Sequence, residues 1–397
     1  MRIVLDARGV RAQSDGMSNY VRHLVVNLLK VDLTNEYIVL GNQLLQAHLA
    51  QASLLERTNL RLIISSIPFM GPAQYILIPW TVQRLPRVTL YHYPHFDMPY
   101  LAHPCSVVTI FDVNQMANGY FGSLRRLKRF YSCQTTRLSV TKAHHILTIS
   151  HQTKHELLMR FPWLDAQKVS VVYFGLNEIF QHHYNQTHVA QFRQKFHLGT
   201  DRFILYVGTD RPHKNLKRLL EAYAHLKQQM AVPPRLLLVG SLDRDGPTGH
   251  MIRALGLDAS VHILGYLSEE ELPLAYQASE VFAYCSVSEG FGMPLLEAMA
   301  SGVPIITSRV GAMAEIVGES AILVDPGSVD SIAEGLYRAL TSDEMRRQLI
   351  DRGLTRVKQF SWEESARKTL DVYARVVNER CVGIPPTNGD APRACPG

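Results

Sequence analysis

Short apolar runs alternate with segments of helical periodicity along most of this 397-residue chain. In the first half, runs of strand length occur at residues 3–5, 37–40, 60–64, 88–91, 107–111 and 146–149. The pattern restarts at Phe203, with further runs at residues 203–208, 235–240 and 261–266. Alternation of this kind is typical of parallel sheets whose strands are joined by crossover helices. We therefore expect an α/β protein.

The pattern is interrupted once, which indicates two domains. A strand ends near Gly175, and the polar segment 181–194 carries no strand pattern. A chain of 397 residues also exceeds what one hydrophobic core usually serves. The expected parts are a first domain over 1–180, a second over 181–360, a closing helix over 361–380 and a disordered tail over 381–397. In that helix, Ser361 and Glu364 form a predicted capping box, and the tail is rich in Pro and Gly.

Two carboxylates, Glu289 and Glu297, flank a glycine-containing loop and a predicted helix start. Gly290 and Gly292 permit close approach of the backbone, and Pro294 suits the first turn of a helix. The loop amides and the helix N-terminus would face an anion. An ionised carboxylate accepts hydrogen bonds from two vicinal hydroxyls at once. The alternative is a helix N-terminus with two acids placed for its dipole.

Two cations, Arg211 and Lys214, follow the predicted strand 203–208. In open α/β sheets, ligands bind in the crevice at the carboxyl ends of the strands. A diphosphate there would require fixed positive charge beside the glycine turn at Gly208. Taken alone, the same pair would suit the solvated start of a helix.

These two segments resemble motifs of the family-4 retaining glycosyltransferases, also called group 1. The run from Glu289 to Glu297 is similar to the E-x7-E signature, and Arg211 to Asn215 is similar to an R-x-x-K-N segment. The resemblance extends over nearly all of residues 1–377. It implies the GT-B architecture, with two facing Rossmann-like, doubly wound domains and a cleft between them. Glu289 would then orient the donor hexose, Glu297 would bind the ribose, and Arg211 with Lys214 would neutralise the diphosphate without a metal or other cofactor.

The same resemblance assigns further positions around the donor. They are Gly16 in the turn before the first helix, Gly208 and Gly240 at strand ends, Tyr266 beside the nucleobase, and Phe291, Gly292, Met293, Pro294 and Leu295 between the two glutamates. Tyr266 fits either base stacking or plain packing. Gly16 either brings backbone amides to the phosphate or only forms a turn, and Ser18 stands where many members carry a second Gly.

One position departs from the family pattern. Many members carry a His-Asp pair after the central strand of the first domain, and its His reaches the donor sugar. This chain has Phe111-Asp112 instead, and phenylalanine makes no side-chain hydrogen bond. Asp112 either serves the acceptor hydroxyl or caps a turn. His92 and His95, at another strand end, are candidates for the missing polar group.

Composition narrows the class of protein. Hydrophobic residues make up 46% and charged residues 19%, as in a globular protein. There is no run of eighteen apolar residues, and the start is too polar for a signal peptide, so we expect a cytoplasmic protein. The five cysteines are scattered without a C-x-x-C pair, which argues against a zinc site or disulfides.

Positive charge is concentrated in the first half. Residues 1–180 hold 18 Lys and Arg against 10 Asp and Glu, and no acidic residue lies between Val113 and His155. In a predicted helix there, Leu124, Leu127, Tyr131 and Leu138 form one stripe, with Arg125, Arg126, Lys128 and Arg129 on the other side. Such a helix either lies on the anionic inner leaflet or packs its apolar stripe on its own domain. No motif for nucleic-acid recognition accompanies the charge.

The sequence therefore predicts a retaining, metal-independent hexosyltransferase. It would move a mannose- or glucose-type hexose from a nucleoside diphosphate sugar to a hydroxyl of a saccharide or lipid-linked acceptor, in polysaccharide or glycolipid assembly. Two alternatives remain open: a nucleotide-sugar epimerase of the same fold, and a non-catalytic protein that binds sugar nucleotides. The donor base, the hexose, the acceptor and the linkage are not determined by the sequence.

Overall fold

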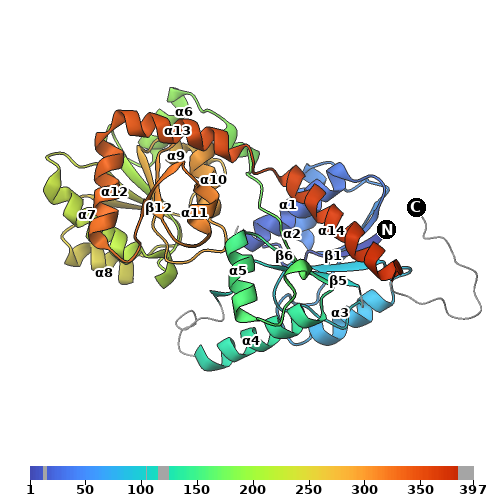
Figure 1. Ribbon diagram of the computed structural model, residues 1–397. Helices are drawn as coiled ribbons and strands as arrows, with labels where there is room; N and C mark the ends of the chain where they lie inside the picture. Colours follow the sequence, from blue (N-terminus) through green and yellow to red (C-terminus); the bar gives the residue numbers. More distant parts are fainter. Residues whose placement is uncertain (12–15, 104, 115–124, 383–397) are drawn as a thin grey trace, which may run out of the picture. The chain divides into compact units, whose positions relative to one another are not determined.

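The computed structural model describes residues 1–11, 16–103, 105–114 and 125–382 (Figure 1). The chain forms two compact units, one over residues 1–175 together with the segment from Trp362, the other over Leu176–Ser361. The chain passes from the first unit to the second after Gly175, earlier than the boundary expected at 180–181. Leu176 already belongs to the second unit, because its N–H donates to the Phe360 carbonyl at 3.1 Å. Of the disordered tail expected at 381–397, residues 381 and 382 are the last residues of a helix, and the rest lies outside the described residues.

The first unit contains a seven-stranded sheet in the order β3-β2-β1-β4-β5-β6-β7, and its paired strands run parallel. The strands are β1 Arg2–Asp6, β2 Glu36–Gly41, β3 Leu60–Ile64, β4 Leu90–Tyr93, β5 Ser106–Ile110, β6 His145–Thr148 and β7 Val169–Val171. The strand expected at 88–91 is β4, which continues to Tyr93. His92 is tolerated inside it because its ring nitrogens bond Tyr373 at 2.5 Å and Thr109 at 2.8 Å.

Helices cover this sheet on both faces. They are α1 Gly16–Val31, α2 Gln43–Gln51, α3 Gln74–Gln83, α4 Arg125–Lys142, α5 His151–Arg160 and α14 Trp362–Val382. Helix α1 buries Tyr20, Leu24 and Leu28, a spacing that forms one apolar stripe. Figure 1 shows α14 running alongside α1, and the Trp362 ring stacks on His23 with centroids 4.8 Å apart. The C-terminal helix therefore completes the first unit.

Helix α4 turns a different side to the sheet from the apolar stripe that was one candidate for packing there. Its buried face combines Val140 with the small hydroxyl side chains of Ser132, Thr136 and Ser139, and Ser139 Oγ accepts a hydrogen bond from the Met98 amide at 2.9 Å. Within the expected apolar stripe, Leu127 is 71% exposed, Tyr131 41% and Leu138 39%, and Leu124 lies outside the described residues. Leu127 therefore does not pack on its own domain as expected, whereas Tyr131 and Leu138 do so in part, beside Tyr75 and Tyr100.

The second unit repeats the architecture with a six-stranded parallel sheet, in the order β10-β9-β8-β11-β12-β13. The strands are β8 Phe203–Val207, β9 Arg235–Val239, β10 Val261–Gly265, β11 Val281–Tyr284, β12 Ile305–Ser308 and β13 Ala321–Val324. The helices are α6 Gln186–Lys195, α7 Leu216–Gln229, α8 Pro247–Ala254, α9 Glu271–Gln277, α10 Met293–Ala300, α11 Gly311–Val317, α12 Val329–Thr341 and α13 Asp343–Val357. Both units thus confirm the expected α/β class with doubly wound, parallel sheets.

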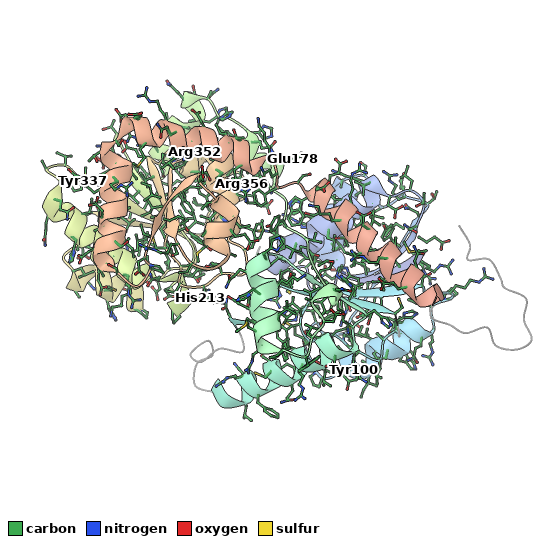
Figure 2. The ribbon with its side chains drawn as sticks, viewed as in Figure 1. Tyr100, Glu178, His213, Tyr337, Arg352 and Arg356 are labelled. Carbon is green, nitrogen blue, oxygen red and sulfur yellow. The ribbon has the colours of Figure 1, made fainter. Side chains whose placement is uncertain are left out.

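In the second unit, a long polar side chain binds the C-terminal end of α11. Arg356 of α13, labelled in Figure 2, donates to the carbonyls of Glu315 and Ile316 at 2.9 and 3.1 Å. These carbonyls lie in the last turn of α11, where the helix leaves its acceptors unpaired and partially negative. The guanidinium therefore fixes α11 against α13.

The carboxyl ends of β8, β9 and β10 approach one another through their backbones. The Gly208 amide donates to the Val239 carbonyl at 2.9 Å, and the Gly240 amide donates to the Gly265 carbonyl at 2.8 Å. Gly240 has φ +129°, and a Cβ at this position would lie 1.9 Å from the Gly208 carbonyl oxygen. Only glycine meets both the conformational and the steric requirement.

We predict that Gly240→Ala lowers the free energy of unfolding by roughly 3 kcal/mol or more, because strain and a backbone clash add. Gly256→Ala is the matched control: Gly256 also has a positive φ, of +65°, but a Cβ there meets open space. The control should lose only about 1–2 kcal/mol. Urea unfolding of both variants measures the difference, and equal losses would contradict the steric argument.

Candidate functional site

The sequence-predicted cations and the first glutamate meet where the strand order of the second sheet reverses. Strands β8 and β11 are neighbours at this point, with Leu205 opposite Phe282. The loop after β8 carries Arg211 and Lys214, and the loop after β11 carries Glu289. In doubly wound sheets, the reversal leaves a crevice at the carboxyl ends of these two strands, which is the usual ligand site.

Lys214 and Glu289 form a largely buried ion pair. Lys214 Nζ lies 2.8 Å from Glu289 Oε1, and the two side chains are 18% and 13% exposed. Lys214 also donates to the Tyr284 hydroxyl at 2.9 Å. Burial, and then the negative charge of Glu289, raise the pKa of Tyr284 well above its usual value, so this phenol keeps its proton. The structure therefore brings two predicted site residues into direct contact.

A short turn fixes the position of Lys214. Residues Pro212–Lys214 form a 3-10 turn that ends at Asn215, which is buried and left-handed with φ +58°. The side-chain amide of Asn215 donates through Nδ2 to the backbone carbonyls of Cys285 and Pro326, at 2.9 and 2.8 Å. The turn is thereby tied to the loops that follow β11 and β13. The sequence signal for this role was available, since Asn is one of the few residues that adopt the left-handed conformation readily.

Arg211 lies at the start of the same turn, with an extended backbone at φ −60° and ψ 142°. Its side chain is exposed, in contrast to that of Lys214. His213, labelled in Figure 2, lies between the two cations in sequence, and its carbonyl accepts from the Val287 amide at 2.8 Å. The turn therefore presents one exposed and one buried cation beside the β11 loop.

Glu297 lies within α10 and has a different environment. It is half-buried, and the Tyr276 hydroxyl donates to its Oε2 at 2.8 Å. Burial raises the pKa of Glu297 to about 7, although the hydrogen bond from Tyr276 acts in the opposite direction. The carboxyl group therefore titrates near neutral pH. Tyr276 was not predicted, because an aromatic residue on α9 has the same sequence pattern as a core residue.

The geometry does not fit two acids placed for a helix dipole. Helix α10, which is described in full, has no acidic residue in its first turn. Glu289 precedes the helix, and Glu297 lies past its midpoint, in contact with Tyr276 of another helix. Both carboxylates therefore have positions that the dipole alternative does not explain.

The segment between the glutamates is held by packing. Gly292 caps α10 with φ +99°, and a Cβ there would lie 3.0 Å from Leu295 Cδ1. Pro294 is in the first helical turn, as expected, and Met293 begins the helix. The side chains of Leu295 and Phe291 are buried, so these two residues can reach a ligand only through their backbones.

Three other expected donor residues have distinct surroundings. Gly208 and Gly240 lie at the backbone junction of the strand ends. Tyr266 is 59% exposed after β10, which does not support plain packing for its ring. Gly16 is exposed at the first position of α1, and the residues just before it lie outside the described ranges.

In the first unit, the position of the missing histidine is filled by packing. The Phe111 ring contacts Tyr20 edge-on, with centroids 5.2 Å apart, and also meets Phe174 at 6.0 Å. Asp112 Oδ1 accepts from the Asn114 amide at 2.8 Å, which is the turn-capping arrangement. His92 is fully buried, and burial lowers its pKa to about 3. His92 therefore does not supply a polar group to a ligand in this structure.

A second polar cluster lies where the strand order of the first sheet reverses, after β4. His95 Nδ1 donates to Asp97 Oδ1 at 2.5 Å, because a carboxylate oxygen carries no proton to give. Asp97 is fully buried and also accepts from Tyr93 at 3.1 Å and from Gln74 at 2.9 Å. This arrangement orients the His95 ring. Sequence reasoning included His95 but missed Asp97 and Gln74, because Gln74 reaches Asp97 from a segment 23 positions away.

Neither a metal-binding cluster nor a membrane-spanning helix is present in the described part of the chain. Within residues 1–11, 16–103, 105–114 and 125–382, no three His, Cys, Asp or Glu side chains lie where they would hold a metal ion. In the same ranges, no helix combines the length and the apolar character that crossing a bilayer requires. Among the cysteines in these ranges, Cys105, Cys133 and Cys285 are free thiols.

Comparison with known proteins identifies the family. The sequence profile of the family described as glycosyl transferases group 1 matches residues 188–356. O-antigen chain mannosyltransferase B of Escherichia coli is 30% identical over 285 residues, which cover 72% of this chain and 74% of that protein. MMP alpha-(1->4)-mannosyltransferase of Mycolicibacterium hassiacum is 35% identical over 237 residues, 58% of this chain and 54% of that protein.

The fold also matches that of a solved structure. Anabaena Alr3699/HepE, crystallised in complex with UDP and glucose, superimposes with a TM-score of 0.73 at 16% identity, covering 94% of this chain and all of the other. This likeness shows the GT-B fold. Since the Escherichia coli relative matches over most of both sequences and the family profile spans most of the second unit, this chain belongs to the group 1 glycosyltransferases.

Proposed function

We propose that the chain is a retaining hexosyltransferase that transfers a hexose, most simply mannose, from a nucleoside diphosphate sugar. The observation that carries this proposal is the buried pair of Lys214 and Glu289 at the strand-order reversal, with Glu297 on the next helix. The names of the two curated relatives support mannose. UDP and glucose in the Anabaena structure support a nucleotide sugar as the donor class.

The ion pair stabilises two charges where little solvent reaches them. Lys214 and Glu289 compensate each other in a region of low exposure, where an unpaired charge would be costly. The diphosphate of the donor would attract Lys214 and the nearby Arg211. Glu289 would then accept hydrogen bonds from the hexose hydroxyls, and Glu297 from the ribose hydroxyls. Two cations at the diphosphate support a reaction that needs no metal.

In the proposed transfer, the acceptor hydroxyl oxygen forms a bond to the anomeric carbon of the hexose. The bond from that carbon to the diphosphate oxygen breaks, and the nucleoside diphosphate leaves with the electron pair. The hydroxyl proton passes to a phosphate oxygen of the leaving group. Attack on the face from which the nucleotide departs retains the anomeric configuration, and Arg211 with Lys214 would stabilise the charge that develops on the diphosphate.

The acceptor is proposed to be a saccharide or lipid-linked saccharide at an anionic membrane surface. The excess of Lys and Arg within residues 1–180 supports an anionic surface or acceptor. The name of the Escherichia coli relative, which refers to the O-antigen chain, supports polysaccharide assembly. His95, oriented by the buried Asp97, and Asp112 are the polar groups of the first unit proposed to contact an acceptor.

The proposed function predicts that one member of a panel of UDP-, GDP- and ADP-sugars binds and is slowly hydrolysed to the α-sugar. The Glu297→Ala variant should bind that donor more weakly, because the ribose hydroxyls lose their acceptor. NMR of the released sugar reads the anomeric configuration directly. Release of a β-sugar would contradict retention, and release of an epimerised free sugar would favour the epimerase alternative.

For the diphosphate, we expect Arg211→Ala to cost about 1.5–3 kcal/mol of transition-state stabilisation, which is roughly a 10- to 100-fold loss in kcat/KM. Arg211 is exposed, so folding should be unaffected. Lys217→Ala is the control, since Lys217 is 76% exposed on α7 and forms a surface ion pair with Glu221 at 3.9 Å. Steady-state kinetics of both variants test whether Arg211 stabilises the diphosphate. Equal losses of kcat/KM in the two variants would argue against this role.

Donor binding should depend on pH through Glu297. The raised pKa of about 7 means that the carboxyl group is protonated below this pH and ionised above it. The ionised form accepts hydroxyl hydrogen bonds on both oxygens, so the donor KM should fall as pH rises through about 7. In the Glu297→Gln variant, this fall of the donor KM should disappear. If the donor KM of the wild type and of the variant depends on pH in the same way, Glu297 is not the titrating group.

A further inference from the structure

The outer faces of α3 and α4 expose large apolar side chains. Leu127 and Phe130 of α4 are 71% and 64% exposed, and Ile76 and Trp80 of α3 are 73% and 56% exposed. Each helix uses its other side to pack on the sheet, so these residues are the outward face of a packed layer. We define Ile76, Trp80, Leu127, Phe130, Tyr131 and Leu138 as the α3–α4 face. Exposure of this kind on two neighbouring helices marks an interaction surface.

The two helices form one continuous surface. The hydroxyls of Tyr75 on α3 and Tyr131 on α4 lie 3.3 Å apart. A hollow of about 210 Å³ lies between the helices, lined by Tyr75, Tyr100, Thr135 and Leu138. Figure 1 shows α3 and α4 on the same side of the first sheet, and Figure 2 labels Tyr100 close to them. The α3–α4 face therefore combines aliphatic and aromatic residues around an open hollow.

The segment that contains both helices carries almost only positive charge. Lys128, Arg137 and Lys142 are exposed on α4. The sequence from Arg57 to His155 contains only two acidic residues, Asp97 and Asp112, and Asp97 is fully buried in its hydrogen-bond network. A surface of exposed apolar residues with basic flanks complements an anionic bilayer, because apolar and aromatic side chains enter the interface while cations meet the lipid phosphates.

We propose that the α3–α4 face docks on an anionic lipid bilayer, with Leu127 and Phe130 entering the apolar layer and the α4 cations lying among the headgroups. This inference rests on the proposed location at a membrane surface and assigns the residues that make the contact. It also accounts for the choice of small hydroxyl residues on the inner side of α4. These residues leave the larger apolar side chains free for the bilayer.

Vesicle sedimentation of the full-length protein tests the proposal, using phosphatidylcholine alone and phosphatidylcholine mixed with phosphatidylglycerol. The wild-type protein should bind the anionic vesicles about tenfold more tightly than the neutral ones. Combining Leu127→Ser with Phe130→Ser should lower binding to anionic vesicles by about tenfold or more. Val232→Ser is the control, because Val232 is 77% exposed in the second unit. Combining Lys128→Gln with Arg137→Gln should lower only the preference for anionic lipid.

Two outcomes would overturn the proposal. One is that the wild-type protein binds neither kind of vesicle, or binds anionic vesicles no more tightly than the Leu127→Ser/Phe130→Ser variant does. The other is a wild-type dimer in light scattering that this variant converts to a monomer, which would make the face a contact between copies of the chain. Hexose transfer to a water-soluble acceptor, measured on the same samples, should be unchanged in the variant. Its absence in the wild-type protein would count against the proposed function and not against docking.

Discussion

Parallel pairing of the strands is the constraint on which the arrangement of both units depends. When every strand runs in the same direction, all carboxyl ends lie along one edge of the sheet, and the connecting helices must return across its faces. In the second unit, the order reverses between β8 and β11, so the loops after these strands diverge and leave room for a ligand. Lys214 and Glu289 come from these two loops. Their contact is thus a consequence of topology, although 75 positions of sequence separate them.

Burial gives the two glutamates different chemical properties. Glu289 has a cation at 2.8 Å, which compensates its charge, whereas Glu297 has a neutral phenol at 2.8 Å and a pKa raised to about 7. A charged partner favours the ionised form more strongly than a neutral hydrogen-bond donor does in the same low-dielectric surroundings. The two carboxyl groups of one short motif are therefore prepared differently for their proposed ligands, by residues that lie on other elements.

In helix α4, the size of the side chains decides which side is buried more than their hydrophobicity does. Its apolar residues have the spacing of a core-facing stripe, yet Ser132, Thr136 and Ser139 occupy the buried side. Short side chains let the helix axis lie closer to the strands, and the cost of burying hydroxyls is reduced where a partner is present, as for Ser139 with the Met98 amide. The large apolar residues are left outside, next to the exposed outer face of α3.

The sequence by itself determined the α/β class, the strands with continuous apolar runs, and the glycine and proline positions around α10, because these depend on local periodicity and backbone conformation. It also indicated the family through short motifs whose spacing is local. Only the tertiary structure decided that Lys214 pairs with Glu289 and that Tyr276 contacts Glu297, since such contacts depend on the order of strands and helices. The tertiary structure brought Gln74 to Asp97 from a distant segment. It also decided which side of α4 is buried. The periodicity showed one apolar stripe, but packing in the folded chain buried another side, because Ser132, Thr136 and Ser139 fit beside Val140 in the space against the sheet.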